Sequence, residues 1–353
     1  MAELELLDSV EKIADGDKGK MLSAVLQTPE MIETALRFPL IGSLDQGDKT
    51  KLVVIAGMGG SGISGEILAD AFPLACPVIV AKKYSLPDYV TEETKVVAVS
   101  YSGETEETLS VVRQAEARGA KIICVTSGGK LKELASKNNW PLVLIPTGFQ
   151  PRAALMYLFI PLLQVLSKLG VIEAQEAEIV KSLPLLKKLR DEYAPACPVR
   201  GNQAKQLAKK VAGRIPVIIG SSGTTGAIAT RFKNQFNENS KLPACASVFP
   251  EVSHNETASY FAMPRDKYNF ALIILRDEAD NERIKKRIEI TKSLLSQQFG
   301  GISEFASQGK SRFARLASLI LLADFASVYA AIIQGVDPTA IEAITRLKRE
   351  MSR

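Results

Sequence analysis

The chain has 353 residues, 46% of them hydrophobic, which is enough for two domains with ordinary cores. Its 44 Lys and Arg against 39 Asp and Glu leave a formal charge of +5 spread along the chain without a basic tract, so no nucleic-acid partner is predicted. Four widely spaced cysteines, a single histidine and no leader-like N-terminal segment favour a reducing, cytoplasmic location and disfavour a metal centre.

The first half of the chain alternates between short strands and helices. A helical arm is predicted at 1–37, and helical spacing recurs at 106–118 and 130–137. Apolar, β-branched strands are predicted at 52–56, 77–81, 96–100, 121–125 and 141–145. Continuous apolar strands separated by helices are typical of a parallel sheet covered on both faces, which predicts an α/β domain of about five strands at 38–170.

The second half repeats this pattern. A closing helix at 155–169 and a charged helical connector at 171–200 lead to a second α/β domain at 201–353, again with a parallel sheet of about five strands. It starts with a strand at 215–220, a Ser/Thr/Gly loop and a long helix ending near 239. Further strands are predicted at 244–249 and 270–275, and helices at 203–211, 281–297, 311–333 and 338–351.

The most apolar stretch of the chain is 313–335. Arg315 and Asp324 interrupt it, so it is interpreted as a buried helix and not as a membrane span. No membrane partner is predicted.

A hydroxyl-rich loop follows the strand at 96–100, where a helix is expected to begin. S-Y-S-G-E-T, from Ser100 to Thr105, places three Ser and Thr side chains and a glycine there. The first N–H groups of a helix have no intrahelical partner and carry partial positive charge, so hydroxyls beside them complete a site for a small anion. The loop predicts a phosphorylated ligand, although the same residues are common in ordinary tight turns.

A glycine-rich segment follows the first strand. G-M-G-G-S-G, from Gly57, matches the G-x-G-x-x-G pattern of dinucleotide-binding folds. Such a site uses an acidic residue about 20 residues further on to hold the ribose, whereas the strand at 77–81 is followed by Lys82 and Lys83. Two lysines suit a 2′-phosphate, so an NADP-binding oxidoreductase remains an alternative. Two Ser-rich loops at one edge of a parallel sheet suit a compact phosphate better.

Both loops resemble those of the sugar-isomerase (SIS) domain, a parallel α/β module that binds phosphosugars. The resemblance rests on G-M-G-G-S-G-I-S-G from Gly57 and on S-Y-S-G-E-T from Ser100. Later segments make the chain similar to the bifunctional phosphoglucose/phosphomannose isomerase family of archaea and some bacteria, from about residue 52 to the C-terminus. These segments are 150–154, 237–239, 250–256, 335–338 and 347–348. The family resemblance implies two tandem SIS domains.

The resemblance also implies an activity, the interconversion of glucose 6-phosphate and mannose 6-phosphate with fructose 6-phosphate, without a metal or other cofactor. This reaction opens the sugar ring and moves a proton between C2 and C1 through a cis-enediol. By resemblance Glu238 is the base, His254 the acid that protonates the ring oxygen, and Lys348 a cation that stabilises the enediolate or assists proton transfer. Taken alone, each residue also suits a structural role at a helix end or a surface loop.

Substrate binding is likewise assigned by resemblance. The phosphate is assigned to the loop residues Gly60, Ser61, Ser100, Ser102 and Thr105. The guanidinium of Arg152 is expected to pair with the phosphate or with sugar oxygens, its alternative being a structural role at the domain junction. Thr339 is a candidate small hydroxyl near C2, and a homodimer with its active site near the subunit interface is expected.

One further alternative is a non-catalytic SIS protein, a sensor or regulator that binds a phosphosugar. The joint presence of Glu238 and His254 disfavours it.

Overall fold

The computed structural model describes residues 6–44, 49–264, 269–299 and 301–351. The chain divides into two compact units. Unit 1 comprises Met1–Leu26, Leu185–Gln308 and Arg315–Arg353, and unit 2 comprises Gln27–Pro184 and Gly309–Ala314. The predicted arm at 1–37 is thus shared between the units, while the domain boundaries expected from the sequence remain predictions.

Unit 2 is built on a six-stranded sheet, sheet A, in the order β1-β6-β5-β4-β2-β3. All neighbours are parallel except β1, which pairs antiparallel with β6. The strands are β1 (Leu40–Ile41), β2 (Val53–Ala56), β3 (Val78–Ala81), β4 (Lys95–Ser100), β5 (Lys121–Thr126) and β6 (Leu142–Leu144). The helices are α4 (Thr28–Ala35), α5 (Gly59–Ala71), α6 (Glu106–Ala117), α7 (Gly129–Lys137) and α8 (Leu155–Lys168).

Both faces of sheet A are covered by helices, as its continuous apolar strands require. On one face, alternate strand residues such as Val54, Val96 and Ile122 pack against buried side chains of α6 and α7. Their neighbours along the strands, including Ile55, are equally buried and face the side of α5, where Gly65 lies against Ile55. The sheet is therefore a rigid platform from whose carboxyl edge the loops project.

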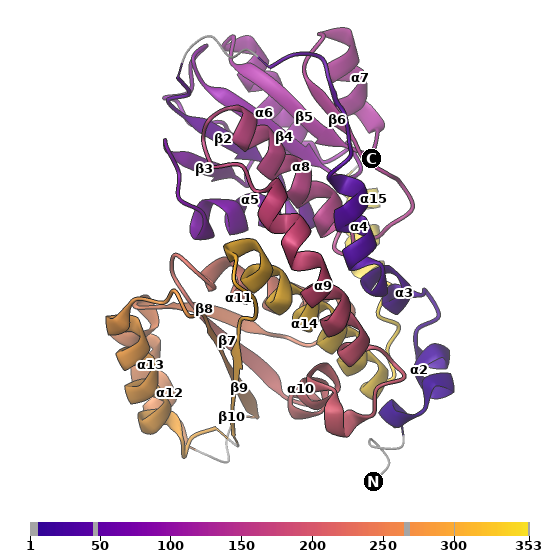
Figure 1. Cartoon of the computed structure of the whole chain (residues 1–353), viewed down its shortest axis with the longest axis vertical. Helices are drawn as coiled ribbons and strands as arrows, with labels where there is room; N and C mark the ends of the chain where they lie inside the picture. The colour runs from indigo at the N-terminus through magenta and orange to yellow at the C-terminus, as the bar shows by residue number, and fades with distance from the viewer. Residues whose placement is uncertain (1–5, 45–48, 265–268, 300, 352–353) are drawn as a thin grey trace. The chain divides into compact units, whose positions relative to one another are not determined.

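Unit 1 is built on a four-stranded parallel sheet, sheet B, in the order β10-β9-β7-β8. Its strands are β7 (Ile215–Ser221), β8 (Cys245–Phe249), β9 (Phe270–Arg276) and β10 (Ile302–Ala306). In Figure 1, α12 and α13 lie on one side of this sheet, and α10, α11 and α14 on the other. The core between the sheet and α13 includes Val217, Leu272, Ile274 and Ile288.

The remaining elements complete the chain. They are α2 (Val10–Gly16), α3 (Met21–Leu26), α9 (Glu176–Tyr193), η1 (Val199–Gly201), α10 (Gln203–Val211), α11 (Gly226–Asn239), η2 (Glu251–His254), α12 (Glu256–Ala262), α13 (Glu282–Leu295), α14 (Arg312–Ile333) and α15 (Glu342–Met351). Among the described residues, α14 alone is long and apolar enough to span a membrane, and 94% of its most apolar window is buried inside the protein. Such burial is typical of a core helix.

The predicted α/β fold class is confirmed, with differences at the edges of the sheets. The sequence predicted neither β1 nor β10, and sheet B has four strands instead of about five. Helix α12 was also not predicted; it has seven residues, none of them fully buried, and Tyr260 packs partly buried against the core of sheet B. Helix α5 begins at Gly59, inside the segment that was expected to be a loop.

Candidate active site

The carboxyl edge of sheet A carries the first predicted loop. Because α5 begins at Gly59, Gly60 and Ser61 lie in its first turn, where the N–H of Ser61 already donates to the carbonyl oxygen of Met58 at 2.9 Å. Met58 precedes this turn and gives it no side-chain cap. Ser61 is buried, and its Oγ accepts a hydrogen bond of 3.1 Å from the N–H of Tyr101. The first loop is therefore joined directly to the second.

The second loop orders its hydroxyls by local hydrogen bonds. Ser100 Oγ and Thr105 Oγ1 are 3.0 Å apart, and Ser100 Oγ also accepts from the N–H of Gly103 at 3.1 Å. Ser102 is exposed, and its Oγ accepts from the N–H of Glu104 at 3.2 Å. Thr105 occupies the N-cap position of α6 without capping it through its side chain. The first turn of α6 thus has no side-chain cap from Thr105, and it also carries the carboxylates of Glu106 and Glu107.

A third segment, around Arg152, lies directly against the first loop. A Cβ added at Gly60 would lie 2.8 Å from the carbonyl oxygen of Pro151 and 3.2 Å from the backbone nitrogen of Arg152, so only glycine allows this approach. Arg152 itself is 2% exposed, with Nη1 3.5 Å from Gln150 Oε1. The structure therefore brings the predicted phosphate residues of both loops and the Arg152 backbone to one edge of sheet A. Below, these three segments are called the cradle.

A fourth loop supports the cradle and was not singled out in the sequence. Gly103 has a φ of +70°, and a Cβ there would lie 1.9 Å from the carbonyl oxygen of Gly128. Ser127 Oγ donates to the Tyr101 carbonyl at 2.6 Å, and the N–H of Lys130 donates to Glu104 Oε1 at 2.8 Å. The Ser-Gly-Gly run after β5 was the available signal, and it resembled an ordinary turn.

The three residues predicted to perform the chemistry lie on separate elements of unit 1. Glu238 is half-buried in the last turn of α11. His254 is the exposed last residue of η2, and Lys348 is exposed on α15, a helix that buries none of its side chains. Their catalytic roles remain predictions.

The element that carries Glu238 is fixed by buried polar contacts. Arg231 on α11 donates to both carboxylate oxygens of Asp324 on α14, at 2.7 and 2.8 Å, and Gln235 Nε2 donates to the same carboxylate at 2.7 Å. All three residues are at most 5% exposed. Burial raises the pKa of Asp324, while the guanidinium of Arg231 acts in the opposite direction. One turn further along α11, Asn239 Nδ2 donates to Ser327 Oγ at 2.9 Å.

The segment that carries His254 is fixed by Glu256. Its carboxylate accepts from Ser247 Oγ on β8 at 2.6 Å and from the Tyr260 hydroxyl at 2.9 Å. Burial, followed by the contact with Glu256, raises the pKa of Tyr260. Asn255 Nδ2 donates to Glu251 Oε1 at 2.7 Å across the η2 turn. These bonds give an exposed histidine a defined backbone.

Thr339, the candidate for contact near C2, packs against the N-terminal arm. A Cβ at Gly19 would lie 2.2 Å from Thr339 Cβ and Oγ1, so the arm reaches this threonine only because residue 19 is glycine. The N–H of Thr339 donates to Asp337 Oδ1 at 2.8 Å. Its relation to C2 of a substrate remains a prediction.

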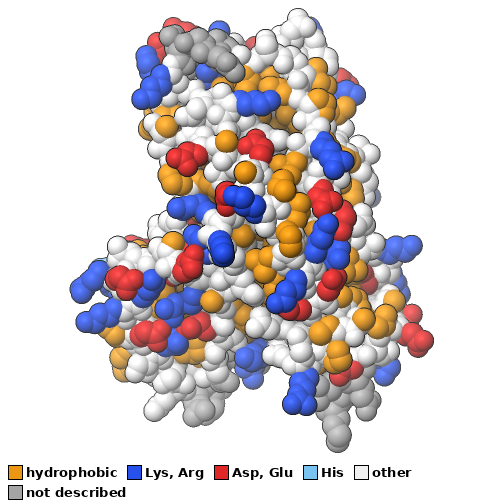
Figure 2. Space-filling view, viewed as in Figure 1, with side chains coloured by type: hydrophobic (Ala, Val, Ile, Leu, Met, Phe, Trp, Pro, Cys, Tyr) orange, Lys and Arg blue, Asp and Glu red, His pale blue; other side chains and the backbone are white. Residues whose placement is uncertain are grey.

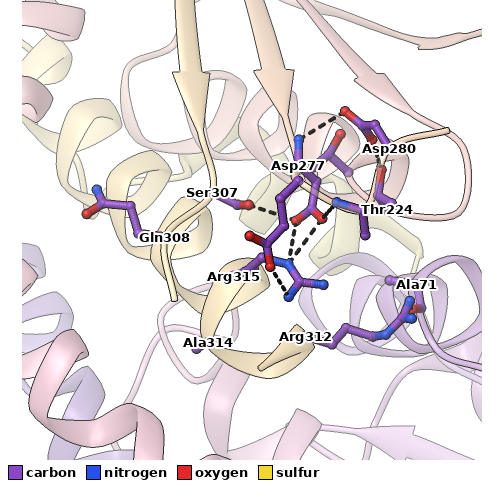
Figure 3. A network of polar contacts seen from close by, with 12 residues as sticks. Ala71, Thr224, Asp277, Asp280, Ser307, Gln308, Arg312, Ala314 and Arg315 are labelled. Carbon is purple, nitrogen blue, oxygen red and sulfur yellow. Dashed lines mark hydrogen bonds and ion pairs between the residues drawn. The ribbon is translucent and has the colours of Figure 1, made fainter. Parts of the chain in front are cut away.

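The carboxyl edge of sheet B carries a network of carboxylate, hydroxyl and guanidinium groups (Figure 3). Thr224 Oγ1 donates to Asp280 Oδ1 at 2.5 Å, and Asp280 Oδ2 accepts from the N–H of Asp277. The Asp277 carboxylate in turn accepts from Arg315 at 3.1 Å and from Ser307 Oγ at 2.7 Å. One carboxylate, that of Asp280, thus contacts the hydroxyl loop that follows β7, and its negative charge disfavours a phosphate there.

Two family models match the chain. The model "SIS domain" matches residues 48–139, and the model "Bacterial phospho-glucose isomerase C-terminal SIS domain" matches residues 200–351. Both matched segments contain the predicted strand, hydroxyl loop and helix. The fold and the cradle therefore define an SIS-domain protein.

Curated relatives identify the family. A bifunctional phosphoglucose/phosphomannose isomerase of Caldicellulosiruptor bescii is 43% identical over 335 residues, covering 94% of this chain and 99% of the relative. Proteins of the same name from Aquifex aeolicus and Thermoplasma acidophilum are 37% and 38% identical, covering 86% and 85% of this chain and 91% and 89% of the relatives. The chain belongs to the bifunctional phosphoglucose/phosphomannose isomerase family, which confirms the predicted family and that the chain is an enzyme.

Solved structures agree at the level of the fold. A hypothetical protein from Thermus thermophilus superposes with a TM-score of 0.72 at 16% identity, covering 94% of this chain and 90% of that one. A glucose-6-phosphate isomerase-like protein from the same organism gives a TM-score of 0.64 at 18% identity, covering 97% and 98%.

Proposed function

We propose that this isomerase interconverts glucose 6-phosphate and mannose 6-phosphate with fructose 6-phosphate. The observation that carries the proposal is the 43% identity to a relative of that name over 94% of the chain. The cradle supports it, because hydroxyls and uncapped helix N-termini at the edge of sheet A suit the 6-phosphate common to all three sugars.

In the proposed mechanism, one set of residues holds the phosphate and another performs the chemistry. The holding set is Gly60, Ser61, Ser100, Ser102, Thr105 and Arg152. His254 protonates the ring oxygen as the ring opens, after which Glu238 removes the C2 proton and returns it to C1. Lys348 stabilises the negative charge of the enediolate. Rotation about C2–C3 of the open chain lets one base serve both C2 epimers.

We also propose that the enzyme is a cytoplasmic homodimer. Support for a dimer comes from α15, on which Ile344, Leu347 and Met351 follow each other at helical spacing and are 39%, 62% and 59% exposed. An unpaired apolar face of this kind is typical of a surface that is covered in an assembly.

A coupled assay tests the activity. Purified protein is given fructose 6-phosphate with chelator present, and glucose 6-phosphate and mannose 6-phosphate are measured separately. Glu238→Gln is expected to abolish formation of both aldoses, with Glu282→Gln as the matched control, since Glu282 is an exposed glutamate of unit 1 on α13. Wild-type protein that binds fructose 6-phosphate without converting it would instead be a sensor. Loss of only one activity in Glu238→Gln would contradict a shared base.

The same assay also tests a second candidate activity. A relative from Sulfolobus acidocaldarius named D-glucosamine-6-phosphate 4-epimerase is 32% identical over 293 residues, covering 83% of this chain and 86% of that protein. Incubation with D-glucosamine 6-phosphate therefore distinguishes epimerisation at C4 from isomerisation between C1 and C2.

A further inference from the structure

Lys241 lies just beyond the end of α11 and has an unusual backbone. Its φ is +56°, in the left-handed region that favours glycine. A left-handed residue just beyond the C-cap is a common helix ending, accompanied here by a bond from the N–H of Leu242 to the Phe236 carbonyl oxygen at 3.2 Å. Lys241 is three residues after Glu238, the proposed base.

The ammonium of Lys241 bridges two segments that are distant in the sequence. Nζ donates to the carbonyl oxygens of Glu238 at 2.9 Å and Asn239 at 3.1 Å, the last two residues of α11. It also donates to the carbonyl oxygen of Asp337 at 2.7 Å, in the segment that joins α14 to α15. Lysine side chains often cap a helix C-terminus, but the bond to Asp337 spans 96 residues and is not part of such a cap.

These contacts also bear on whether Lys241 binds the substrate directly. An ammonium has three N–H donors, and three carbonyl oxygens lie within hydrogen-bond distance of Nζ. These contacts place the side chain of Lys241 on the backbone of two segments, through which it acts.

Further hydrogen bonds fix the turn around Lys241 to α14 and to the residue that follows it. Ser240 Oγ donates to the carbonyl oxygen of Ser327 on α14 at 2.6 Å, and the Ser240 carbonyl accepts from Gln334 Nε2 at 2.6 Å. Asn237 Nδ2 donates to the Leu242 carbonyl at 2.8 Å. The end of α11 is thus fixed to α14, and Lys241 adds the link to the segment that precedes α15.

We propose that Lys241 is a positioning residue of the isomerase reaction. Its ammonium ties the backbone of Glu238 to that of Asp337, and so couples the turn that presents the base to the segment leading to Lys348. This inference rests on the proposed function, in which Glu238 and Lys348 act on the substrate.

The test compares three substitutions with a control. Lys241→Met removes the ammonium, and Lys241→Gly also removes it while relieving the positive φ. Lys241→Arg keeps the charge and N–H donors. Lys168→Met is the matched control, because Lys168 is an exposed lysine in the last turn of α8. For each variant, kcat and KM for fructose 6-phosphate, the melting temperature and amide hydrogen exchange of 334–351 are measured.

Lys241→Met and Lys241→Gly are expected to lower kcat at least about tenfold with KM within about twofold, because a small displacement of a catalytic group slows the reaction more than it weakens binding. Lys241→Gly should keep the wild-type melting temperature, Lys241→Arg should recover most of kcat, and exchange at 334–351 should be faster in the Met and Gly variants. The Lys168→Met control should match wild type in all four measurements.

Three results would overturn the inference: wild-type kcat in Lys241→Gly, unchanged exchange at 334–351, or a rise in KM equal to the loss in kcat. A wild-type protein without isomerase activity would refute the proposed function and not the bridge. The exchange data would then decide alone whether Lys241 restrains the segment before α15.

Discussion

Replacement of Gly103 by alanine should disable the cradle while leaving the rest of unit 2 folded. Two effects act at this position. The φ of +70° costs an L-residue about 1–2 kcal/mol. In addition, the new Cβ would lie 1.9 Å from the carbonyl oxygen of Gly128 and 2.9 Å from Thr126 Oγ1, so the loop must move by about 1.5 Å to reach an ordinary contact distance of 3.4 Å.

A glycine at the other end of α6 separates the two effects. Gly119 has almost the same φ, +71°, but a Cβ there would meet only Glu92 Cβ at 3.4 Å, an ordinary contact. Gly119→Ala therefore carries the backbone cost alone, about 1–2 kcal/mol. A displacement of about 1 Å costs on the order of 100-fold in rate, so Gly103→Ala, whose loop must move further, should lower kcat/KM for fructose 6-phosphate by at least about that factor.

The assay is the coupled conversion of fructose 6-phosphate, with urea unfolding of both variants alongside it. We expect similar losses of stability from the shared φ cost, a further loss in Gly103→Ala from the displaced loop, and loss of activity in Gly103→Ala alone. Wild-type kcat/KM in a folded Gly103→Ala protein would refute the assignment of the phosphate to this loop.

Three other predictions follow from buried and exposed groups. Asp324→Asn leaves the Arg231 guanidinium buried without its counter-charge and should lower the free energy of unfolding by about 3–5 kcal/mol in urea, whereas the exposed Glu289→Gln should change it by less than about 1 kcal/mol. Burial raises the pKa of the Cys124 thiol from 9.0 to about 12. The unfolded thiol thus ionises first, so stability from this group is present below pH 9 and is lost as the pH rises toward 12. At pH 8 a thiol reagent should modify the exposed Cys245 rapidly and Cys124 only after unfolding. Calorimetric titration with sorbitol 6-phosphate, which has no carbonyl to isomerise, should give one site per chain; two equal sites would contradict the difference between the two sheet edges.

Most of the fold could be predicted because its strands are continuous apolar runs between amphipathic helices. All five predicted strands of sheet A and the three of sheet B exist. The missed strands are edge strands with weak patterns. β1 has two residues and an exposed isoleucine, and β10 carries a glutamate among half-buried residues. Edge strands need only one apolar face and one hydrogen-bonded neighbour, so their sequences approach those of loops.

The sequence predicted those parts of the site whose residues are close together in the chain. Ser100, Ser102 and Thr105 were recognisable because the anion-binding groups of a helix N-terminus are close together in the sequence. The Lys241 bridge could not be recognised in the sequence, because its acceptor at Asp337 is 96 residues away and is a backbone carbonyl that any residue would provide. The same holds for Arg231, whose partner Asp324 appeared in the sequence only as an interruption of an apolar helix.

The carboxyl edges of the two sheets share one backbone pattern but differ in their side chains. Each sheet has a hydroxyl-rich loop after a central strand and a helix that begins there, so the backbone offers the same anion site twice. In unit 1, the Asp280 carboxylate accepts from the Thr224 hydroxyl of this loop and from the N–H of Asp277, and Arg315 pairs with Asp277. On the face seen in Figure 2, basic and acidic side chains are interspersed. Because a carboxylate already accepts from the hydroxyl loop of unit 1, the cradle of unit 2 is the edge expected to bind the phosphate.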